Sequence, residues 1–363
     1  MNTNTYCVIM AGGSGKRLWP VSSKSCPKQF RDVTRAGKSL LQLTFERAAR
    51  LFPPRNILVV TGAAYAGITR EQLPTLPGEN LLEEPFGRNT APCIAYAAHR
   101  IARVAPDATM VVVPSDHFIA DDEAYNGNIQ RGVDFVTRHD GLLTIGISPT
   151  RPETGYGYIQ LERSEPVDGV YRVKTFTEKP DEALALAFLR SGDFLWNAGI
   201  FIWRVRGIIE EFARHLEDVY RLFQDEYLHA TNPDAPENIE RLYSRCPSIS
   251  VDFGIMEHAE RVHVIKGDFG WSDVGTWHAF HDISEKDERG NVPRDGVLFL
   301  DSSGCTVDLP RDVRVVVAGV NDCIIAGRDD VLMVCARDRG GDVRHFEEML
   351  RQRESLRDEE QSR

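Results

Sequence analysis

The first residues able to do chemistry form a glycine-rich, cationic stretch near the N-terminus, AGGSGKRLWP (residues 11–20), which follows the apolar run YCVIM. Such a turn brings backbone N–H groups close to an anion, and the fork of Arg17 and the mobile charge of Lys28 both suit phosphate. A dinucleotide-binding fingerprint would need glycine at Leu18, and a Walker A loop would need serine or threonine at Arg17. The stretch therefore predicts an anion-binding turn of another kind, with a plain turn carrying solvated cations as the alternative.

A second cluster lies in EEPFGRNTAP (residues 83–92). Arg88 and Asn89 come directly before a helix that is predicted to start at Thr90, where backbone donors and the helix dipole favour anions or polar ligand atoms. Glu84 precedes them and accepts hydrogen bonds when it is ionised. The alternative for this stretch is a surface turn that only caps the helix.

Two aspartates follow apolar runs far apart in the chain. Asp116, in PSDH, comes directly after TMVVV, and Asp273, in FGWSDVGTW, lies 157 positions later. Carboxylates at the ends of buried strands can ligate Mg²⁺ and so reach substrate phosphates. The alternative for Asp116 is a cap for a helix near residue 121, and we expect His117 to be a hydrogen-bonded structural residue. The sequence alone leaves open whether the two aspartates meet.

Three motifs place polar groups beside glycine or an apolar run: ETGYGYIQ with Gly157, FTEKPD with Glu178 and Lys179, and FLWNAGIFIW with Asn197. A ligand rich in hydroxyl groups needs such a mixture of acceptors and donors. A hairpin turn and a helix cap at Asp181 explain parts of these motifs equally well, so each motif alone is a weak signal.

The elements that must position these residues alternate along the first three quarters of the chain. Short β-branched runs predict buried strands at residues 6–11, 56–60, 109–113 and 142–146. Helical periodicity marks residues 39–52, with Ser39 as the expected N-cap, and residues 90–105. This alternation predicts an α/β fold with a mostly parallel, doubly wound sheet, in which ligands bind at the carboxyl ends of the strands. The glycine-rich turn and PSDH both follow such ends.

The pattern changes near residue 285. Apolar runs then recur every eight to ten residues, at 297–300, 305–309, 313–317, 323–326 and 331–334. These runs predict an all-β unit. We therefore expect a catalytic domain over residues 1–284 and a C-terminal domain over 285–363, which ends in a helix and a charged tail.

Composition excludes several classes of protein. The net charge of −11 over 363 residues argues against a nucleic-acid-binding protein, which normally has a basic face. No run approaches 18 apolar residues, and the N-terminus lacks the features of a signal peptide, so neither a membrane protein nor a secreted one is expected. Seven cysteines without a C-x-x-C pair predict reduced thiols in a cytoplasmic protein.

The motifs together resemble the sugar nucleotidyltransferases, and among them the mannose-1-phosphate guanylyltransferases. The resemblance rests on AGGSGKRLWP, PKQF, EPFGRNTAP, VPSDH, ETGYGYI, EKP, WNAGIF and WSDVGTW, which occur in that order. It implies a Rossmann-like nucleotidyltransferase domain followed by a small left-handed β-helix. It also implies an enzyme that uses Mg²⁺ and joins GTP to α-D-mannose 1-phosphate, giving GDP-mannose and pyrophosphate.

The resemblance further implies roles for the residues singled out above. Those implied to hold the triphosphate are Gly12, Gly13, Gly15, Arg17 and Lys28. Those implied on the nucleoside side are Glu84, Gly87, Arg88 and Asn89, and those implied in the sugar-phosphate pocket are Gly157, Glu178, Lys179 and Asn197. Asp116 and Asp273 are the implied metal ligands and, with Arg17 and Lys28, the implied catalytic residues. No general base is needed, because a sugar phosphate is already an anionic nucleophile, so catalysis would consist of positioning and charge neutralisation.

Two other functions compete with this one. A guanylyltransferase for another sugar 1-phosphate, such as a heptose, would use the same fold, and a non-catalytic regulatory subunit would keep the fold without the chemistry. The presence of Arg17, Lys28, Asp116 and Asp273 disfavours the silent subunit. We expect the C-terminal domain to support a homodimer, and we expect the isomerase activity found in longer members of the family to be absent.

Overall fold

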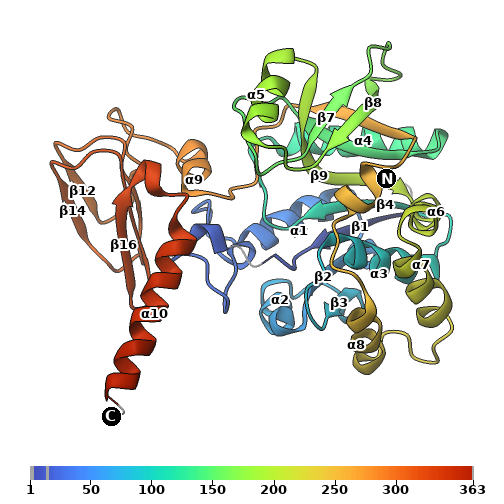
Figure 1. Cartoon of the computed structure of the whole chain (residues 1–363), viewed down its shortest axis with the longest axis horizontal. Helices are drawn as coiled ribbons and strands as arrows, with labels where there is room; N and C mark the ends of the chain where they lie inside the picture. Colours follow the sequence, from blue (N-terminus) through green and yellow to red (C-terminus); the bar gives the residue numbers. More distant parts are fainter. Residues whose placement is uncertain (1–3, 14–15, 362–363) are drawn as a thin grey trace. The chain divides into compact units, whose positions relative to one another are not determined.

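The computed structural model describes residues 4–13 and 16–361, and the chain divides into two units that each draw on several stretches of sequence (Figure 1). The first unit consists of Met1–Gly12, Leu41–Ser115 and Ile119–Trp271. The second consists of Gly13–Leu40, Asp116–Phe118 and Ser272–Arg363. Gly15, one of the predicted nucleotide-binding glycines, lies outside the described residues.

The first unit is built on a nine-stranded sheet in the order β3-β2-β1-β4-β9-β6-β10-β8-β7. The strands are β1 (Thr5–Met10), β2 (Ile57–Gly62), β3 (Leu81–Glu84), β4 (Thr109–Pro114), β6 (Leu142–Ile147), β7 (Tyr158–Leu161), β8 (Val170–Thr177), β9 (Phe194–Arg204) and β10 (Val262–Gly267). The four strands predicted from sequence are β1, β2, β4 and β6, each within two residues of its predicted bounds. The two short strands β5 (Phe118–Ile119) and β11 (Trp271–Ser272) lie where the chain passes between the units.

The direction of the strands corrects the predicted sheet. Strands β3, β2, β1 and β4 are parallel, as are β6 and β10. Strand β9 is antiparallel to both β4 and β6, and β8 is antiparallel to both β10 and β7. The fold is therefore α/β as predicted, but the sheet is mixed. Strands that are buried on both faces carry continuous apolar runs in either direction, so the sequence pattern does not reveal which strands are reversed.

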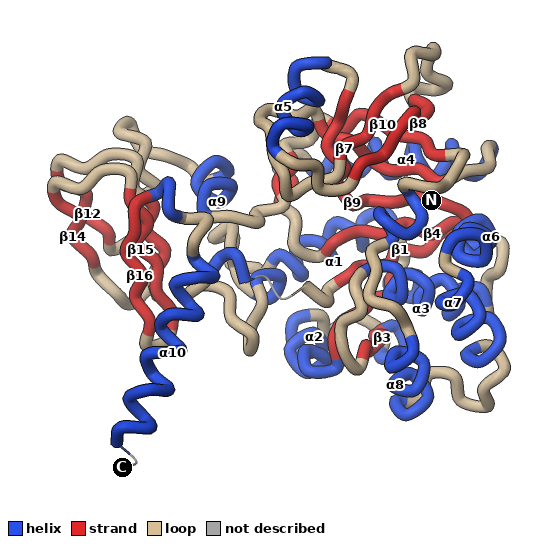
Figure 2. The backbone as a smooth tube through the Cα atoms, in the orientation of Figure 1, coloured by secondary structure: helices blue, strands red, loops and turns tan. Residues whose placement is uncertain are grey.

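Helices pack around this sheet (Figure 2). They are α1 (Leu40–Leu51), α2 (Ala66–Gln72), α3 (Thr90–Ala102), α4 (Asp122–Arg138), α5 (Glu182–Ser191), α6 (Val205–His215), α7 (Glu217–Arg221) and α8 (Pro236–Arg245). The two helices predicted from sequence are α1 and α3, and α3 begins at Thr90 as expected. Helix α3 is buried along most of its length, because its alanines allow close packing in the main core with α6 and α8.

The second unit contains the C-terminal strands predicted from sequence. They are β12 (Val297–Leu300), β13 (Thr306–Asp308), β14 (Val315–Ala318), β15 (Cys323–Arg328) and β16 (Val331–Ala336). Strand β12 pairs in parallel with β14, and β13 pairs in parallel with β15, whereas β15 and β16 are antiparallel. All five predicted runs are confirmed as strands, and the left-handed β-helix stays a prediction. Helices α9 (Trp277–Ile283) and α10 (Val343–Gln361) complete the unit.

The second unit is held together by a core that joins the N-terminal turn region to the C-terminal strands. Leu18 and Val21 share a buried cluster with Trp277, Ile324 and Met333. The indole nitrogen of Trp277 also donates a hydrogen bond to the backbone oxygen of Trp19, at 3.1 Å. The two compact units therefore do not divide the chain at residue 284. A boundary at residue 284 between separately folding domains stays a prediction.

The cysteines and the helices bear on the predicted environment of the protein. All seven cysteines are free thiols, and five of them are buried. Within the described part of the chain, no helix combines the length and the apolar character needed to cross a bilayer. The cytoplasmic location stays a prediction.

The core of the second unit predicts that two adjacent residues of β16 contribute differently to the free energy of unfolding. Met333 is 5% exposed and Leu332 is 64% exposed. Met333→Ala should lower the free energy of unfolding by about 2–5 kcal/mol, because it leaves a cavity in the cluster that holds Leu18. Leu332→Ala should change it by less than about 0.5 kcal/mol. Denaturant unfolding measures both changes, and equal losses in the two variants would contradict the described core.

Candidate active site

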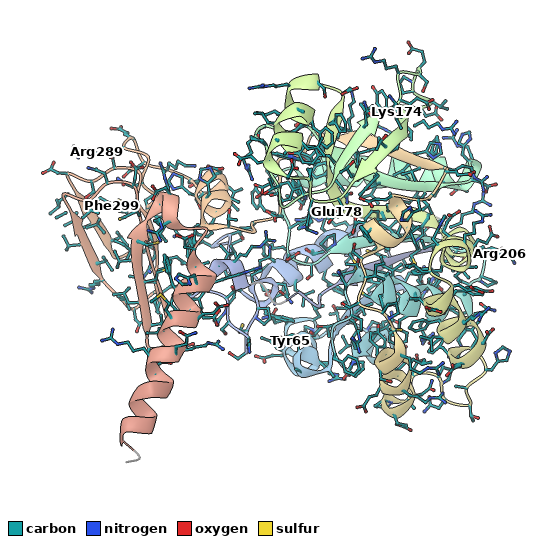
Figure 3. All side chains as sticks on the ribbon, viewed as in Figure 1. Tyr65, Lys174, Glu178, Arg206, Arg289 and Phe299 are labelled. Atoms are coloured by element: carbon teal, nitrogen blue, oxygen red, sulfur yellow. The ribbon has the colours of Figure 1, made fainter. Side chains whose placement is uncertain are left out.

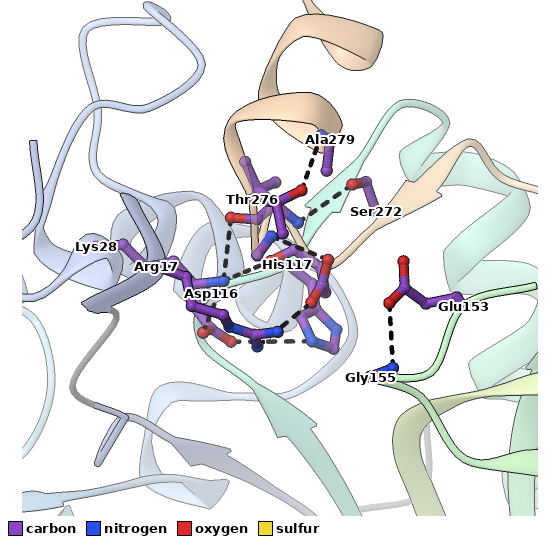
Figure 4. Close-up of polar contacts among 12 residues, drawn as sticks. Arg17, Lys28, Asp116, His117, Glu153, Gly155, Ser272, Thr276 and Ala279 are labelled. Atoms are coloured by element: carbon purple, nitrogen blue, oxygen red, sulfur yellow. Dashed lines mark hydrogen bonds and ion pairs between the residues drawn. The ribbon is translucent and has the colours of Figure 1, made fainter. Parts of the chain in front are cut away.

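The buried ammonium group of Lys28 contacts Asp116 and the turn at Asp273 in the second unit (Figure 4). Lys28 is 5% exposed, and its Nζ lies 3.0 Å from Oδ2 of Asp116. The same nitrogen donates to the backbone oxygen of Asp273 and lies 3.5 Å from that of Val274. The structure therefore brings the carboxylate of Asp116 and the backbone oxygen of Asp273 to a single lysine, so the two segments meet there.

Asp116 is held in its charged form by its neighbours. Burial alone would raise the pKa of this carboxyl, but the positive charge of Lys28 and the contribution of His117 outweigh burial, so the pKa is lowered from its usual range. The Nε2 atom of His117 lies 3.9 Å from Oδ1 of Asp116. The alternative role for Asp116 as a helix cap is excluded, because Asp121 caps α4 by accepting hydrogen bonds from two backbone N–H groups.

Asp273 lies in a tight turn in which a side chain at Gly275 would meet its carboxylate. Its Oδ1 accepts a hydrogen bond from the N–H of Gly275 at 2.9 Å, and a Cβ atom on Gly275 would collide with Oδ2. The Oδ2 atom also lies 3.8 Å from a guanidinium nitrogen of Arg17, whose side chain is 47% exposed. The turn after β1 is tied to the same unit, because the amide of Gln29 donates to the backbone oxygen of Gly13 at 2.8 Å. Sequence reasoning missed Gln29.

The donor set in the second unit fits Mg²⁺. Asp116 and Asp273 supply hard carboxylate oxygens, and the described residues hold no cluster of three or more histidine, cysteine or acidic side chains. Magnesium is commonly held by one or two carboxylates together with substrate phosphates and water. Asp116 and Asp273 are oxygen donors of this kind.

Glu84 ends β3 in the first unit and is almost completely buried, at 4% exposure. The hydroxyl of Tyr243 donates a hydrogen bond to its Oε1 at 3.1 Å. A Cβ atom on Gly12 would lie 3.1 Å from its Oε2. Burial raises the pKa of Glu84 to about 7, and the hydrogen bond from Tyr243 opposes that rise. The neighbouring Glu83 instead forms an exposed ion pair with Arg70.

Arg88 and Asn89, which follow Glu84, form hydrogen bonds within the chain. Arg88 lies 5.0 Å above the ring of Phe86, and its Nε donates to the backbone oxygen of Tyr243 at 3.1 Å. Asn89 caps α3 by accepting from the N–H of Thr90 at 2.9 Å, and its backbone has φ 66° and ψ −166°. That conformation is strained for any residue except glycine and is typical of functional sites. Gly87 is exposed, and a Cβ atom there would meet nothing within 4 Å.

The four residues predicted for the sugar-phosphate pocket gather in the first unit. The backbone N–H of Asn197, on β9, donates to the oxygen of Gly157 at 2.8 Å. A Cβ atom on Gly157 would lie 2.6 Å from Oε2 of Glu178 (Figure 3) and 3.3 Å from Cβ of Asn197. Lys179 forms an ion pair with Glu178, and its own backbone has a positive φ of 48°.

Sequence reasoning missed two acidic residues that hold this cluster. The side-chain amide of Asn197 donates to Asp252 at 2.7 Å, and the backbone N–H of Glu178 donates to Glu257 at 2.7 Å. Burial, and then the charge of Glu178, raise the pKa of Asp252 to about 7. Asp252 begins a π-helical turn, Asp252–Met256, of a kind that is frequent at functional sites. A lone carboxylate within the apolar run VDFGIM was the available signal.

The chain was compared with protein families and known proteins. The family model described as Nucleotidyl transferase matches residues 6–290. A mannose-1-phosphate guanylyltransferase of Escherichia coli is 36% identical over 351 residues, covering 95% of this chain and 74% of that protein. The alginate biosynthesis protein AlgA of Pseudomonas aeruginosa is 36% identical over 342 residues, covering 93% of this chain and 70% of its own length. Among solved structures, a protein of Thermus thermophilus named as a mannose-1-phosphate geranyltransferase is 36% identical, with a TM-score of 0.86 over 96% of this chain and 99% of that one.

The raised pKa of Asp252 predicts a dependence of stability on pH. Between pH 4 and pH 7 the folded protein keeps a proton on Asp252 that the unfolded chain releases, so this residue lowers the free energy of unfolding as the pH rises through that window. Asp252→Asn removes this contribution while keeping an oxygen that accepts from Asn197. Relative to the wild type, the variant should gain on the order of 1–3 kcal/mol between pH 4 and pH 8.

Denaturant unfolding at a series of pH values measures the difference between the two proteins. Asp107→Asn serves as the control, because Asp107 is 72% exposed and its change should leave the slope of the wild type intact. Parallel stability curves for Asp252→Asn and the wild type would show that Asp252 titrates normally.

Proposed function

The chain belongs to the nucleotidyl transferase family, and from this premise we propose that it transfers GMP from GTP to α-D-mannose 1-phosphate. A phosphate oxygen of the sugar phosphate attacks the α-phosphorus of GTP in line, the bond to the β-phosphate breaks, and the products are GDP-mannose and pyrophosphate. The observation that carries the proposal is the buried Lys28 that joins Asp116 to the turn at Asp273, in a chain that is 36% identical to mannose-1-phosphate guanylyltransferases.

The residues of the second unit supply the charge that this step needs. Lys28 and Arg17 would bind the phosphates of GTP, and the backbone of Gly13 lies at the same turn. Asp116 and Asp273 would hold Mg²⁺, which when bound neutralises the charge that builds on the phosphates. No residue has to remove a proton, because the attacking sugar phosphate is an anion. Positioning and electrostatic stabilisation then account for the catalysis, as in phosphoryl transfer generally.

The sugar would bind at the cluster of Gly157, Glu178 and Asn197. Glu178 offers carboxylate acceptors to hydroxyl groups, and the absence of a side chain at Gly157 leaves room beside it. Lys179, which is 60% exposed, would meet the phosphate of the sugar. The alternatives of a heptose substrate and of a silent regulatory subunit gain no support from the relatives, which carry mannose-1-phosphate guanylyltransferase names or the name AlgA.

The exposed outer faces of the C-terminal strands are the basis for proposing a homodimer. Leu298 is 53% exposed and Val316 is 63% exposed. Leu298 and Val316 are partners in the pairing of β12 with β14, so they form one apolar stripe. Apolar side chains in such an arrangement are typical of an interface.

The proposed activity is tested directly by release of pyrophosphate. Purified protein is assayed with GTP, ATP, UTP, CTP and dTTP, each combined with mannose, glucose and heptose 1-phosphates in the presence of Mg²⁺. We expect the highest kcat/KM for GTP with mannose 1-phosphate. A preference for a heptose 1-phosphate would favour the first alternative, and failure to turn over any pair would contradict the proposal.

The metal site is tested by Asp116→Asn and Asp273→Asn. Each variant loses one anionic ligand, and we expect turnover to fall by about 100-fold or more while the fold is kept, because asparagine still offers Lys28 and Gly275 an acceptor. Asp338→Asn is the control, since Asp338 is exposed in the same unit. Turnover is measured against Mg²⁺ concentration, with thermal unfolding as a check of the fold. Near-normal activity of both variants at low Mg²⁺ would exclude the two-aspartate site.

The choice of base is tested at Glu84. Guanine presents N1–H and N2–H₂ side by side, and an ionised carboxylate meets both donors, whereas adenine offers neither. Glu84→Gln places a donor opposite a donor, so the ratio of kcat/KM for GTP to that for ATP should fall by about 5- to 150-fold, equivalent to about 1–3 kcal/mol. Glu83→Gln is the matched control, because Glu83 pairs with Arg70 instead. An unchanged ratio in Glu84→Gln would assign base recognition to other groups.

A further inference from the structure

Helix α8 is joined to the segment that follows β3 through a single residue, Tyr243. Its hydroxyl donates to Glu84 Oε1 at 3.1 Å, and its backbone oxygen accepts from Arg88 Nε at 3.1 Å. Its ring packs edge-on against Phe86, with centroids 6.4 Å apart. Tyr243 is completely buried, and its hydrogen bond to Glu84, which is itself 4% exposed, is shielded from water. Tyr243 thus contacts the Glu84 carboxylate and the Phe86 ring through its side chain, and Arg88 through its backbone oxygen.

The hydrogen bond from Tyr243 fixes the orientation of the Glu84 carboxylate. Oε1 faces the hydroxyl of Tyr243, and Oε2 faces Gly12, where a Cβ atom would lie only 3.1 Å away. Each carboxylate oxygen can accept two hydrogen bonds, so the bond from Tyr243 leaves acceptor capacity on both oxygens. The hydroxyl therefore orients the group without occupying it.

From this geometry we infer that Tyr243 is a positioning residue that sets the orientation and the charge of Glu84 for recognition of a guanine base. The inference rests on the proposed function, because it gives Glu84 the role of reading the base. Tyr243 itself acts only through Glu84 and does not touch the nucleotide.

The electrostatic surroundings of Glu84 make the hydroxyl important. The groups that face the carboxylate are Tyr243 from α8, Cys93 from α3 and the backbone of Gly12, and burial raises the pKa of both the Cys93 thiol and the Tyr243 phenol, so both are neutral. Arg88 donates to backbone oxygens of α8 instead. Burial raises the pKa of Glu84 to about 7, and the hydrogen bond from Tyr243 acts in the opposite direction by stabilising the ionised form. Loss of that bond should therefore raise the pKa of Glu84.

The test compares Tyr243→Phe with Tyr227→Phe. Tyr227 is also completely buried, and its hydroxyl donates to a carboxylate, Asp234, at 2.7 Å, so its replacement removes a similar bond without touching Glu84. Pyrophosphate release is measured with GTP and with ATP, in the presence of mannose 1-phosphate, from pH 6 to pH 9. Thermal unfolding of each variant checks the fold.

In Tyr243→Phe we expect the GTP-to-ATP ratio of kcat/KM at pH 7 to fall about tenfold, mainly through a higher KM for GTP. The acid limb of the GTP profile should move to higher pH by about 0.5–1 unit. Tyr227→Phe should change neither quantity. In a Glu84→Gln background, Tyr243→Phe should lower the ratio no further, because the group through which it acts is already gone.

Three outcomes would overturn the inference. Tyr243→Phe could leave the ratio and the acid limb unchanged in a protein whose wild type prefers GTP, which would leave the proposed function standing. Tyr227→Phe could shift both quantities equally, which would show a general packing effect. A wild type without preference for GTP would overturn the proposed function and the inference together.

If Tyr243→Phe does not fold, 3-fluorotyrosine at position 243 replaces it. This stronger donor should move the acid limb of the GTP profile to lower pH, and an unmoved limb would overturn the inference.

Discussion

The candidate catalytic centre depends on the pairing of one buried cation. An ammonium group as enclosed as that of Lys28 is costly unless it is paired and hydrogen-bonded. Asp116 supplies the charge, and the backbone oxygens of Asp273 and Val274 supply the remaining acceptors from 245 and 246 positions along the chain. The second unit must therefore bring the segments that carry Lys28, Asp116 and Asp273 to one point. The core around Leu18, Trp277 and Met333 keeps these segments together.

Three acidic residues differ in their pKa because their surroundings differ. Asp116 lies beside a lysine, so its pKa is lowered and it is ionised, as a ligand of a divalent cation must be. Glu84 and Asp252 are buried without a cation as the leading influence, and burial raises the pKa of each to about 7. Groups with such a pKa change charge near neutral pH when their surroundings change. A ligand that donates hydrogen bonds to them would stabilise the ionised form, which links binding to charge.

The sequence predicted strands and helices, which follow from the pattern of neighbouring residues. It did not predict strand direction or the residues that contact the site from distant segments. Four strands of the large sheet, helices α1 and α3, and all five C-terminal strands were predicted from apolar runs and periodicity. The reversal of β9 could not be predicted, because a strand that is buried on both faces has the same apolar pattern in either direction. Tyr243 and Asp252 were missed because each contacts a site residue that lies 159 and 55 positions away, respectively. The α8 segment carries no motif that marks Tyr243, and the lone carboxylate of Asp252 in an apolar run does not reveal which residue it contacts.

Three glycines of the motifs have a second role in the structure, which is to leave space for a neighbouring carboxylate. A glycine-rich turn is usually explained by the approach of backbone N–H groups to phosphate. In this chain, three motif glycines also leave space for a carboxylate. A Cβ atom on Gly12 would lie 3.1 Å from Glu84, one on Gly157 would lie 2.6 Å from Glu178, and one on Gly275 would collide with Asp273. Each of these acids is one of the predicted site residues. A side chain at Gly157 or Gly275 would require the neighbouring carboxylate to move, and one at Gly12 would crowd that of Glu84. The glycines thus leave room for the acids, in addition to the role that glycine-rich turns have beside phosphate.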